Sequence, residues 1–243
     1  MGKPVIFAHR GASAYCPENT MSAFRKAVEL GADGIETDVR MTRDGRIVCI
    51  HDGVLGRTVS GNEPVRELAW AELSERDAGG WFGPEFAGER VPTLEELMEL
   101  AEGHDLILNI ELKGGSDMPA ELPAQVARIV RKYGWLRKTV ISSFHHPALA
   151  AIRAEEPELE TAILYDGHLD KPWDAAFAVS ARTIHPSYGD ATETMIRSSH
   201  AHGCKVNVWT VNDPELARRL IAYGADGIIT DVPDLVRQAT RDL

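Results

Sequence analysis

The 243-residue sequence has few cysteines and no long apolar run. Its three cysteines, Cys16, Cys49 and Cys204, are odd in number and lack metal-type spacing, so we expect no disulfide framework. Cys49 lies in an apolar run and is expected to be a buried, inert thiol. No stretch approaches the roughly 18 apolar residues of a membrane span, and the first apolar run is too short for a signal peptide. These features favour a cytoplasmic protein without stable membrane insertion.

Basic side chains are also in deficit, with 26 Lys and Arg against 37 Asp and Glu, for a net charge of −11. A chain of this charge repels nucleic acid, so a general nucleic-acid binder is not expected. A small phosphate ester still binds where a local cation reverses the field. The composition is otherwise that of an ordinary globular protein and leaves homo-oligomerisation open.

Short apolar runs alternate with amphipathic segments along the whole chain. Strands are expected at residues 5–8, 34–40, 106–111, 139–142, 161–164, 183–185, 206–210 and 227–230. Helices are expected at residues 22–30, 93–102, 122–133, 147–155, 192–201, 214–223 and 234–239. Repeated strand–helix alternation implies parallel strands. Eight of them in residues 1–243 predict an α/β fold, a single (β/α)8 TIM-barrel domain, with a doubly wound open sheet as the alternative.

Local signals define several element ends. Asp44-Gly45 predicts a hairpin that joins the second strand to an extra strand at residues 47–51. Asn19 and Asp213 are expected helix N-caps. Four glycines follow expected helices and suit C-terminal capping: Gly31, Gly134, Gly203 and Gly224.

Residues 53–91 break the alternation. This segment is rich in Gly, Glu and Arg and contains Trp70, Trp81, Phe82 and Phe86. It is expected to be a small insertion of turns and short helices after the second barrel strand. Either a lid that only covers the barrel or a part that shapes the substrate site agrees with this composition.

An internal repeat isolates one residue. The sequence GADGIETDV at residues 31–39 recurs as GADGIITDV at residues 224–232, with Glu36 in place of Ile229. Isoleucine is a typical residue of a buried strand. Because both copies have the same structural task, the second serves as a control, and Glu36 is expected to be present for chemistry.

Acidic side chains cluster near two strand ends. Glu36 and Asp38 share one strand face, at the end of the barrel where active sites lie. Glu111 is the expected third carboxylate, on a face shared with Asn109 and Lys113. Together these acids predict a site for one divalent cation, Mg²⁺ or Ca²⁺. The alternatives are a pair of solvated acids, one acid paired with Arg40, or a Glu111–Lys113 pair.

Two histidines end apolar runs at the same mouth. His9 is followed by Arg10 and Gly11, and His51 by Asp52. Histidine suits acid–base catalysis near neutral pH, while Arg10 and Lys113 suit phosphate binding. Gly11 is expected to let the backbone approach a ligand closely.

Other polar strand ends are less specific. Trp209 is expected to face inward with Asn207 and to form a wall of the substrate pocket, unless it only fills the core. Residues 142–146 and 183–186 are further candidates for the pocket lining, whereas His104, His168, His200 and His202 are expected at the surface.

Taken together, these pieces resemble the glycerophosphodiester phosphodiesterase family over nearly the whole chain. The matching motifs are HRG (9–11), PENT (17–20), ETDV (36–39), HD (51–52), ELK (111–113), VWTVN (208–212) and TDVP (230–233). Each motif is weak alone, and the ordered set is specific.

The resemblance implies a (β/α)8 barrel that hydrolyses glycerophosphodiesters to an alcohol and sn-glycerol 3-phosphate. His9 and His51 would be the acid–base pair, and Arg10 and Lys113 would bind the phosphate. Glu36, Asp38 and Glu111 would hold the cation. The rival interpretation is the same barrel acting on lipids, as a lysophospholipase D or a sphingomyelinase D-like lyase. A non-catalytic phosphodiester-binding barrel and a metal-dependent aldolase or isomerase fit the residues less well.

Overall fold

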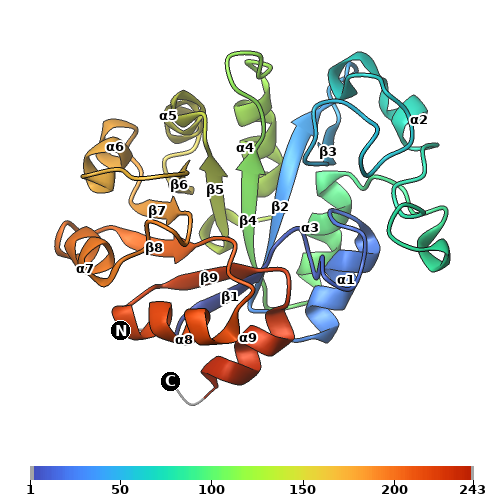
Figure 1. Ribbon diagram of the computed structural model, residues 1–243. Coiled ribbons are helices and arrows are strands. Elements are labelled where there is room, and N and C mark those ends of the chain that lie inside the picture. Colours follow the sequence, from blue (N-terminus) through green and yellow to red (C-terminus); the bar gives the residue numbers. More distant parts are fainter. Residues whose placement is uncertain (1–2, 242–243) are drawn as a thin grey trace.

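A computed structural model describes residues 3–241 as a closed barrel of parallel strands (Figure 1). The barrel strands are β1 (Val5–Ala8), β2 (Gly34–Met41), β4 (Ile107–Leu112), β5 (Thr139–Ser143), β6 (Glu160–Tyr165), β7 (Thr183–Pro186), β8 (Lys205–Val208) and β9 (Gly227–Thr230). The sheet closes because β1 pairs in parallel with both β9 and β2. This closure confirms the expected barrel and excludes the open sheet. Each predicted strand is present, and its ends differ from the predicted ones by at most two residues.

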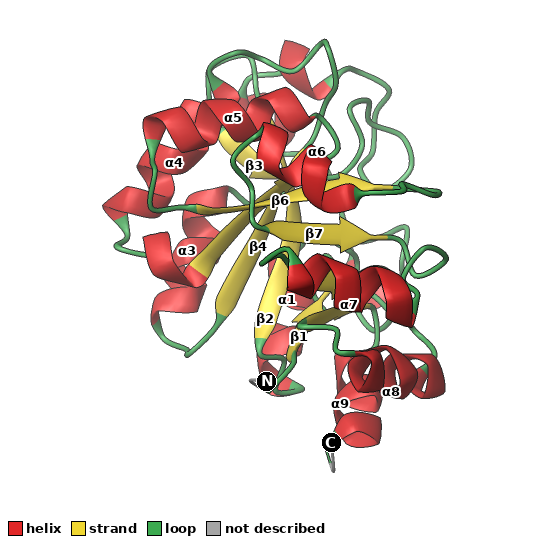
Figure 2. Cartoon of the chain, turned by 90° about the vertical axis from the view of Figure 1, so that its left-hand side faces the viewer, coloured by secondary structure: helices red, strands yellow, loops and turns green. Residues whose placement is uncertain are grey.

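Helices surround the strands on the outside of the barrel (Figure 2). They are α1 (Met21–Glu29), α2 (Trp70–Leu73), α3 (Leu94–Glu102), α4 (Leu122–Lys132), α5 (His146–Glu155), α6 (Pro172–Ala178), α7 (Glu193–Ala201), α8 (Pro214–Tyr223) and α9 (Pro233–Thr240), with short 3₁₀ helices η1 (Val65–Glu67), η2 (Pro84–Phe86) and η3 (Leu136–Lys138). Helix α6 was not among the expected helices, because seven residues are too few to show a 3.6-residue pattern. Within residues 3–241 no helix is both long and apolar enough to cross a membrane.

Helix ends follow the sequence signals with one exception. Asp213 caps α8 as expected, and its side chain accepts a hydrogen bond from the backbone N–H of Glu215. The N-cap of α1 is Thr20 rather than Asn19, because the Thr20 side chain accepts from the Ala23 N–H. The prediction for Asn19 was therefore wrong. Its side chain is used elsewhere, as described below.

The two copies of the repeat flank the first strand. They provide β2 and β9, which pair with β1 on either side. A Cβ atom on Gly34 would lie 2.6 Å from the Phe7 ring, and one on Gly227 would lie 3.3 Å from the same ring. Glycine at both positions therefore makes room for Phe7, which is 2% exposed, between the two strands.

The insertion packs beside β2 and has a small core of its own. Strand β3 (Ile47–Cys49) pairs antiparallel with β2 across the expected hairpin, where Gly45 has φ +83°. Buried side chains of residues 48–91 form a separate cluster: Val48, Ile50, Leu55, Val59, Val65, Leu68, Leu73, Ala78 and Val91. Since this cluster anchors the segment, the residues after His51 have fixed positions beside the barrel mouth.

Candidate functional site

Three carboxylates meet inside the barrel mouth. Glu36 and Asp38 lie on β2 and Glu111 on β4, with Asp38 directly opposite Glu111 in the strand register. One oxygen of each lies within 4.8 Å of the others. All three side chains are buried. This oxygen-rich group has the donor set that a hard divalent cation prefers.

The negative charges of these three carboxylates repel one another. Burial, followed by the charges of Asp38 and Glu111, raises the pKa of Glu36 well above its usual value. Burial and the charge of Asp38 raise the pKa of Glu111 to about 7. The side-chain oxygen of Asn109, on the same face of β4, is buried without a hydrogen-bond partner in residues 3–241. Repelling carboxylates beside an unused oxygen fit a bound cation.

Two basic side chains lie against the carboxylates. Nε of Arg10 is 3.2 Å from Asp38, and Nζ of Lys113 is 2.7 Å from Glu111 and 3.5 Å from Asp38. Burial alone would raise the pKa of Asp38, but the charges of Arg10 and Lys113 outweigh it, and the pKa is lowered. The Glu111–Lys113 pair considered from the sequence is therefore present. Asp38 pairs with Arg10 and Lys113 and not with Arg40.

The backbone around Arg10 is strained. Arg10 has φ +54° and Asn19 has φ +56°, both in the left-handed region. The Arg10 N–H donates to Oε2 of Glu36 at 2.9 Å, and its carbonyl accepts from the Asn19 N–H at 2.9 Å. Such conformations cost about 1–3 kcal/mol each and persist where surrounding contacts impose them. The strain here directs a backbone N–H at a candidate metal ligand.

Asn19 holds the acidic strand in place. Its amide nitrogen donates to Oδ2 of Asp38 at 2.8 Å, and its amide oxygen accepts from the Thr37 hydroxyl at 2.7 Å. Asn19 is 4% exposed. Its role is therefore to orient Asp38, which explains why it does not cap α1.

Gly11 serves packing and not ligand approach. Its φ is +80°, and a Cβ atom would lie 2.6 Å from the backbone of Ala23 in α1. The expectation that it makes space for a ligand was wrong. The glycine instead allows α1 to lie directly against the end of β1.

His9 is held by an acid from the far end of the chain. Its Nδ1–H donates to Oδ1 of Asp231 at 2.6 Å, because an ionised carboxylate only accepts hydrogen bonds. Asp231 also accepts from Ser13 and Asn212. Burial opposes ionisation, but these hydrogen bonds, led by that from His9, lower the pKa of Asp231 to about 2. Within residues 3–241, Nε2 is the ring nitrogen of His9 that has no hydrogen-bond partner.

His51 has a matching partner. Its Nδ1–H donates to Oδ1 of Asp52 at 2.7 Å. Burial opposes ionisation of Asp52, but hydrogen bonds from Arg57 and His51 lower its pKa to about 2. Burial lowers the pKa of His51 itself, an effect that the charge of Asp38 opposes. Arg57 also donates to Glu18, and Glu18 accepts from Arg10. This network links the insertion to the end of β1.

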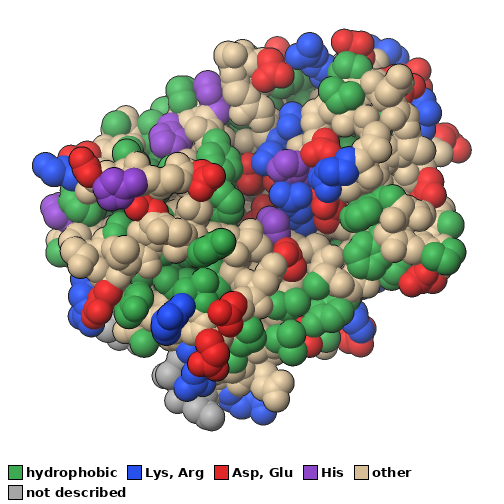
Figure 3. Space-filling model, viewed as in Figure 1, with side chains coloured by type: hydrophobic (Ala, Val, Ile, Leu, Met, Phe, Trp, Pro, Cys, Tyr) green, Lys and Arg blue, Asp and Glu red, His purple; other side chains and the backbone are tan. Residues whose placement is uncertain are grey.

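These side chains surround one cavity of about 270 Å³. Figure 3 shows histidine, acidic and basic side chains gathered in a hollow near the middle of the viewed face. The expected site residues that line it are His9, Arg10, Glu36, His51, Glu111, Lys113 and Trp209, with Asp38 behind them in the carboxylate group. One region of the wall is apolar and consists of Phe144, Leu164, Trp209 and Ile229.

Trp209 forms part of that apolar wall. Its Nε1–H donates to the backbone carbonyl of His185 at 2.8 Å, and its ring meets Phe144 edge-on with centroids 5.6 Å apart. Of the less specific strand ends, Ser142 and Phe144 line the cavity. His185 is completely buried beneath it and accepts a hydrogen bond from Asn207 at 2.9 Å. His146 contacts the carbonyl of Leu164, and His145 precedes α5.

The chain also matches known proteins. The model of the glycerophosphoryl diester phosphodiesterase family matches residues 9–235. The chain belongs to this family. It is 39% identical over 239 residues to a glycerophosphodiester phosphodiesterase of Caldanaerobacter subterraneus subsp. tengcongensis, a match that covers 98% of both chains. It is 35% identical over 232 residues to a glycerophosphodiester phosphodiesterase of Bacillus altitudinis, covering 94% of this chain and 95% of the relative.

Solved structures of related enzymes have the same architecture. An Oleispira antarctica phosphodiesterase in complex with the product sn-glycerol 3-phosphate has a TM-score of 0.93 and 30% identity, covering 98% of this chain and 97% of the other. A glycerophosphodiester phosphodiesterase from Agrobacterium tumefaciens has a TM-score of 0.85 and 32% identity, covering 97% and 100%. The family assignment that the ordered motifs implied is confirmed.

Proposed function

We propose that this member of the glycerophosphodiester phosphodiesterase family hydrolyses glycerophosphodiesters to an alcohol and sn-glycerol 3-phosphate. The observation that carries the proposal is the pair of histidines, His9 and His51, on one cavity wall with three buried carboxylates. Each histidine is held through Nδ1 by its own aspartate. Family membership and a relative solved with sn-glycerol 3-phosphate support the same substrate class.

The two histidines supply the proton transfers. Phosphodiester cleavage needs one group that takes a proton from the attacking hydroxyl and one that gives a proton to the departing alkoxide. Asp231 and Asp52 fix the ring orientation of His9 and His51 and stabilise the imidazolium form of each. The same pair serves direct attack by water, or attack by the glycerol 2-hydroxyl to give a cyclic phosphate that water then opens.

The cationic groups hold the phosphate. Arg10 and Lys113 line the cavity and would bind the non-bridging oxygens, where negative charge accumulates in the transition state. Glu36, Asp38 and Glu111 would hold one divalent cation, Mg²⁺ or Ca²⁺. When bound, that ion would supply further charge stabilisation to the phosphate. The apolar wall at Trp209 would exclude water from one side of the glycerol.

The lipid alternative lacks a supporting observation. An apolar groove under Trp81 and Phe82 would favour lipid substrates. The cavity beside this segment, next to Phe86, is instead lined by six charged side chains. These are Arg25, Glu85, Glu89, Arg90, Glu96 and Glu99.

The direct test is release of glycerol 3-phosphate from glycerophosphocholine and glycerophosphoethanolamine. The wild type would be assayed with Mg²⁺, Ca²⁺ or EDTA, beside His9→Ala and the exposed control His104→Ala. We expect turnover that requires metal, falls by about 10²-fold or more in His9→Ala, and is unchanged in His104→Ala. Full activity in EDTA or in His9→Ala would contradict the proposed mechanism. No turnover of either substrate would point to lipid substrates.

A further inference from the structure

A second cavity adjoins the one that holds the histidines. It measures about 170 Å³ and lies between the insertion, at Gly53–Val54 and Pro64–Arg66, and the loop after β4, at Lys113–Pro119. Its remaining wall is Arg40 and Met41 from the end of β2. Lys113 lines both cavities. A ligand whose phosphate lies at Lys113 can therefore extend into either one.

Arg40 is an arginine without an acidic partner. Its Nε–H donates to the backbone carbonyl of His51 at 2.8 Å. In the described part of the chain no carboxylate lies within ion-pair distance of its guanidinium. A Cβ atom on Gly53 would lie 3.2 Å from Nη1 of Arg40, so glycine leaves the guanidinium its space. Arg40 is half-buried, which limits its solvation by water. A guanidinium placed in this way binds a carboxylate or phosphate well.

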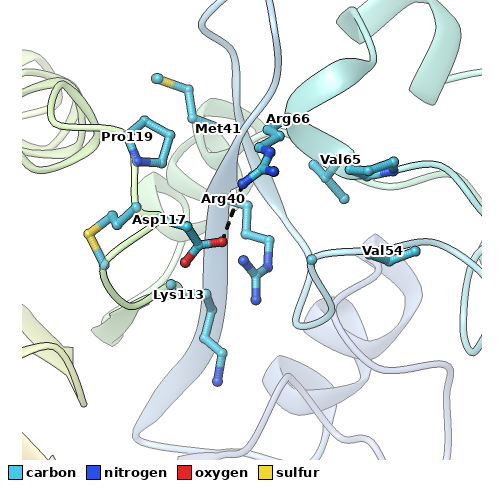
Figure 4. A pocket seen from close by; sticks show the side chains of 12 residues that line it. Arg40, Met41, Val54, Val65, Arg66, Lys113, Asp117 and Pro119 are labelled. Atoms are coloured by element: carbon cyan, nitrogen blue, oxygen red, sulfur yellow. Dashed lines mark hydrogen bonds and ion pairs between the residues drawn. The ribbon is translucent and has the colours of Figure 1, made fainter.

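The other charges around this cavity are compensated. Nη1 of Arg66 is 3.4 Å from Oδ2 of Asp117, and Lys113 pairs with Glu111. Figure 4 shows the Arg66–Asp117 pair across one side of the cavity, with the Arg40 and Lys113 side chains extending in the same direction. The lining has three basic residues and one acid, so its charge is positive although the whole chain is acidic.

A phosphodiester has two arms, and two cavities meet at Lys113. The first cavity is built from barrel strands and has the apolar wall of Trp209, Phe144 and Leu164. The common glycerol arm suits that rigid site. The second cavity is built largely from loops, which carry specificity in this type of barrel. The variable alcohol arm suits the second cavity.

We propose that this second cavity binds the departing alcohol, and that Arg40 makes the enzyme prefer alcohols that carry an anionic group, such as a carboxylate. This inference rests on the proposed function and names its substrate class. It assigns head-group selection to Arg40 and the insertion. From the sequence, shaping the substrate site was one of two interpretations of the insertion, and the strand ends at residues 142–146 and 183–186 were further candidates for the pocket.

Glycerophosphoserine and glycerophosphoethanolamine form a matched substrate pair, because they differ only by the carboxylate of the head group. We expect kcat/KM of the wild type to be about tenfold or more higher for glycerophosphoserine. One charge-assisted hydrogen bond between Arg40 and the carboxylate accounts for a preference of this size. Arg40→Met keeps the aliphatic stem and removes the charge. It is expected to bring the ratio close to one. Arg43→Met, on the same hairpin but paired with Glu72 away from the cavity, is the control and should keep the wild-type ratio.

The ratio of kcat/KM for the two substrates distinguishes a change in head-group selection from a general loss of activity. A loss of His51 support in Arg40→Met would lower both rates together and leave the ratio unchanged. Asp117→Asn gives a second measurement, and we expect the ratio to rise because an acid that repels the carboxylate is removed. A wild-type ratio near one, or a ratio that Arg40→Met does not alter, would overturn the inference while the proposed function stands. No turnover of either substrate by the wild type would overturn the proposed function itself.

Discussion

His9 and Asp231 are 222 positions apart in the sequence, yet Nδ1 of His9 lies 2.6 Å from Oδ1 of Asp231. The contact exists because β1 and β9, the first and last barrel strands, pair with each other. His9 and Asp231 each follow the end of one of these strands. Closure of the barrel therefore assembles a histidine–aspartate unit from the two ends of the chain.

Asp231→Asn is expected to impair catalysis severely. An asparagine keeps the shape but no longer holds the Nδ1–H tautomer or stabilises the imidazolium of His9, so kcat should fall on the order of 10²–10⁴-fold. The control is Asp234→Asn, three residues on, whose carboxylate accepts from Tyr15 at 2.8 Å. Steady-state kinetics on glycerophosphoethanolamine measure kcat of both variants. Turnover of Asp231→Asn within twofold of wild type would remove Asp231 from the mechanism.

The two histidines should differ in role. Arg40 contacts the carbonyl of His51, and Gly53 lines the cavity proposed for the departing alcohol. His51 is therefore expected to protonate that alcohol, and His9 to act as the base. A substrate with a 4-nitrophenolate leaving group needs no proton donor. With this substrate, the loss of rate caused by His51→Ala should be smaller by about tenfold or more than with an alkyl substrate. The loss of rate caused by His9→Ala should be the same with both substrates. The opposite pattern would exchange the two roles.

Much of the site was predictable from strand ends. Parallel strands of a barrel present their carboxyl ends at one mouth, so polar residues at the ends of separate apolar runs had to meet there. Glu36, Asp38 and Glu111 do meet, and the control copy of the repeat had already singled out Glu36. The fold followed in the same way from eight expected strands that alternate with helical segments.

The supporting contacts were not predictable from local pattern. Asn19 suited an N-cap as well as Thr20 did, and only the tertiary position of Asp38 decides between them. Asp231 lies in the TDVP motif and corresponds to Asp38 in the second copy of the repeat, but neither pattern indicated that it would hold His9. The available clue was the barrel itself, because closure makes the ends of the first and last strands neighbours. The Arg57–Glu18 contact depends on how the insertion folds back, which no periodicity encodes.

Removing one carboxylate should remove most of the thermal stabilisation by metal. For the wild type, metal at about 100 times its Kd should stabilise the fold by about 3 kcal/mol, or roughly 5–10 °C in Tm for a chain of this size. Glu36→Gln should lose most of that shift. In EDTA the variant should be at least as stable as wild type, because a repelling buried charge is removed.

Differential scanning fluorimetry with EDTA, Mg²⁺ and Ca²⁺ measures this response without reference to activity. The matched control is Glu29→Gln on the exposed face of α1, which should respond to metal as the wild type does. An equal Tm shift in Glu36→Gln would show that the cation binds elsewhere.

The last prediction concerns His185, which is fully buried below the cavity. Burial lowers its pKa to about 3, while an unfolded histidine has a pKa of about 6.5. Between these values the unfolded chain binds one more proton than the folded chain. The contribution of His185 is therefore fully present above about pH 6.5 and is lost as pH falls towards 3, with a slope of up to about 1.4 kcal/mol per pH unit.

His185→Gln tests this assignment. A glutamine stays neutral at every pH, and its carbonyl can accept the hydrogen bond that Asn207 donates to Nε2 of His185. Urea unfolding at several values between pH 4 and 7 should show a shallower loss of unfolding free energy in this variant than in wild type. His104→Gln, at an exposed site, should keep the wild-type slope. Parallel pH profiles for His185→Gln and wild type would mean that His185 is protonated in the folded protein, and the geometry of its contact with Asn207 would then have to differ.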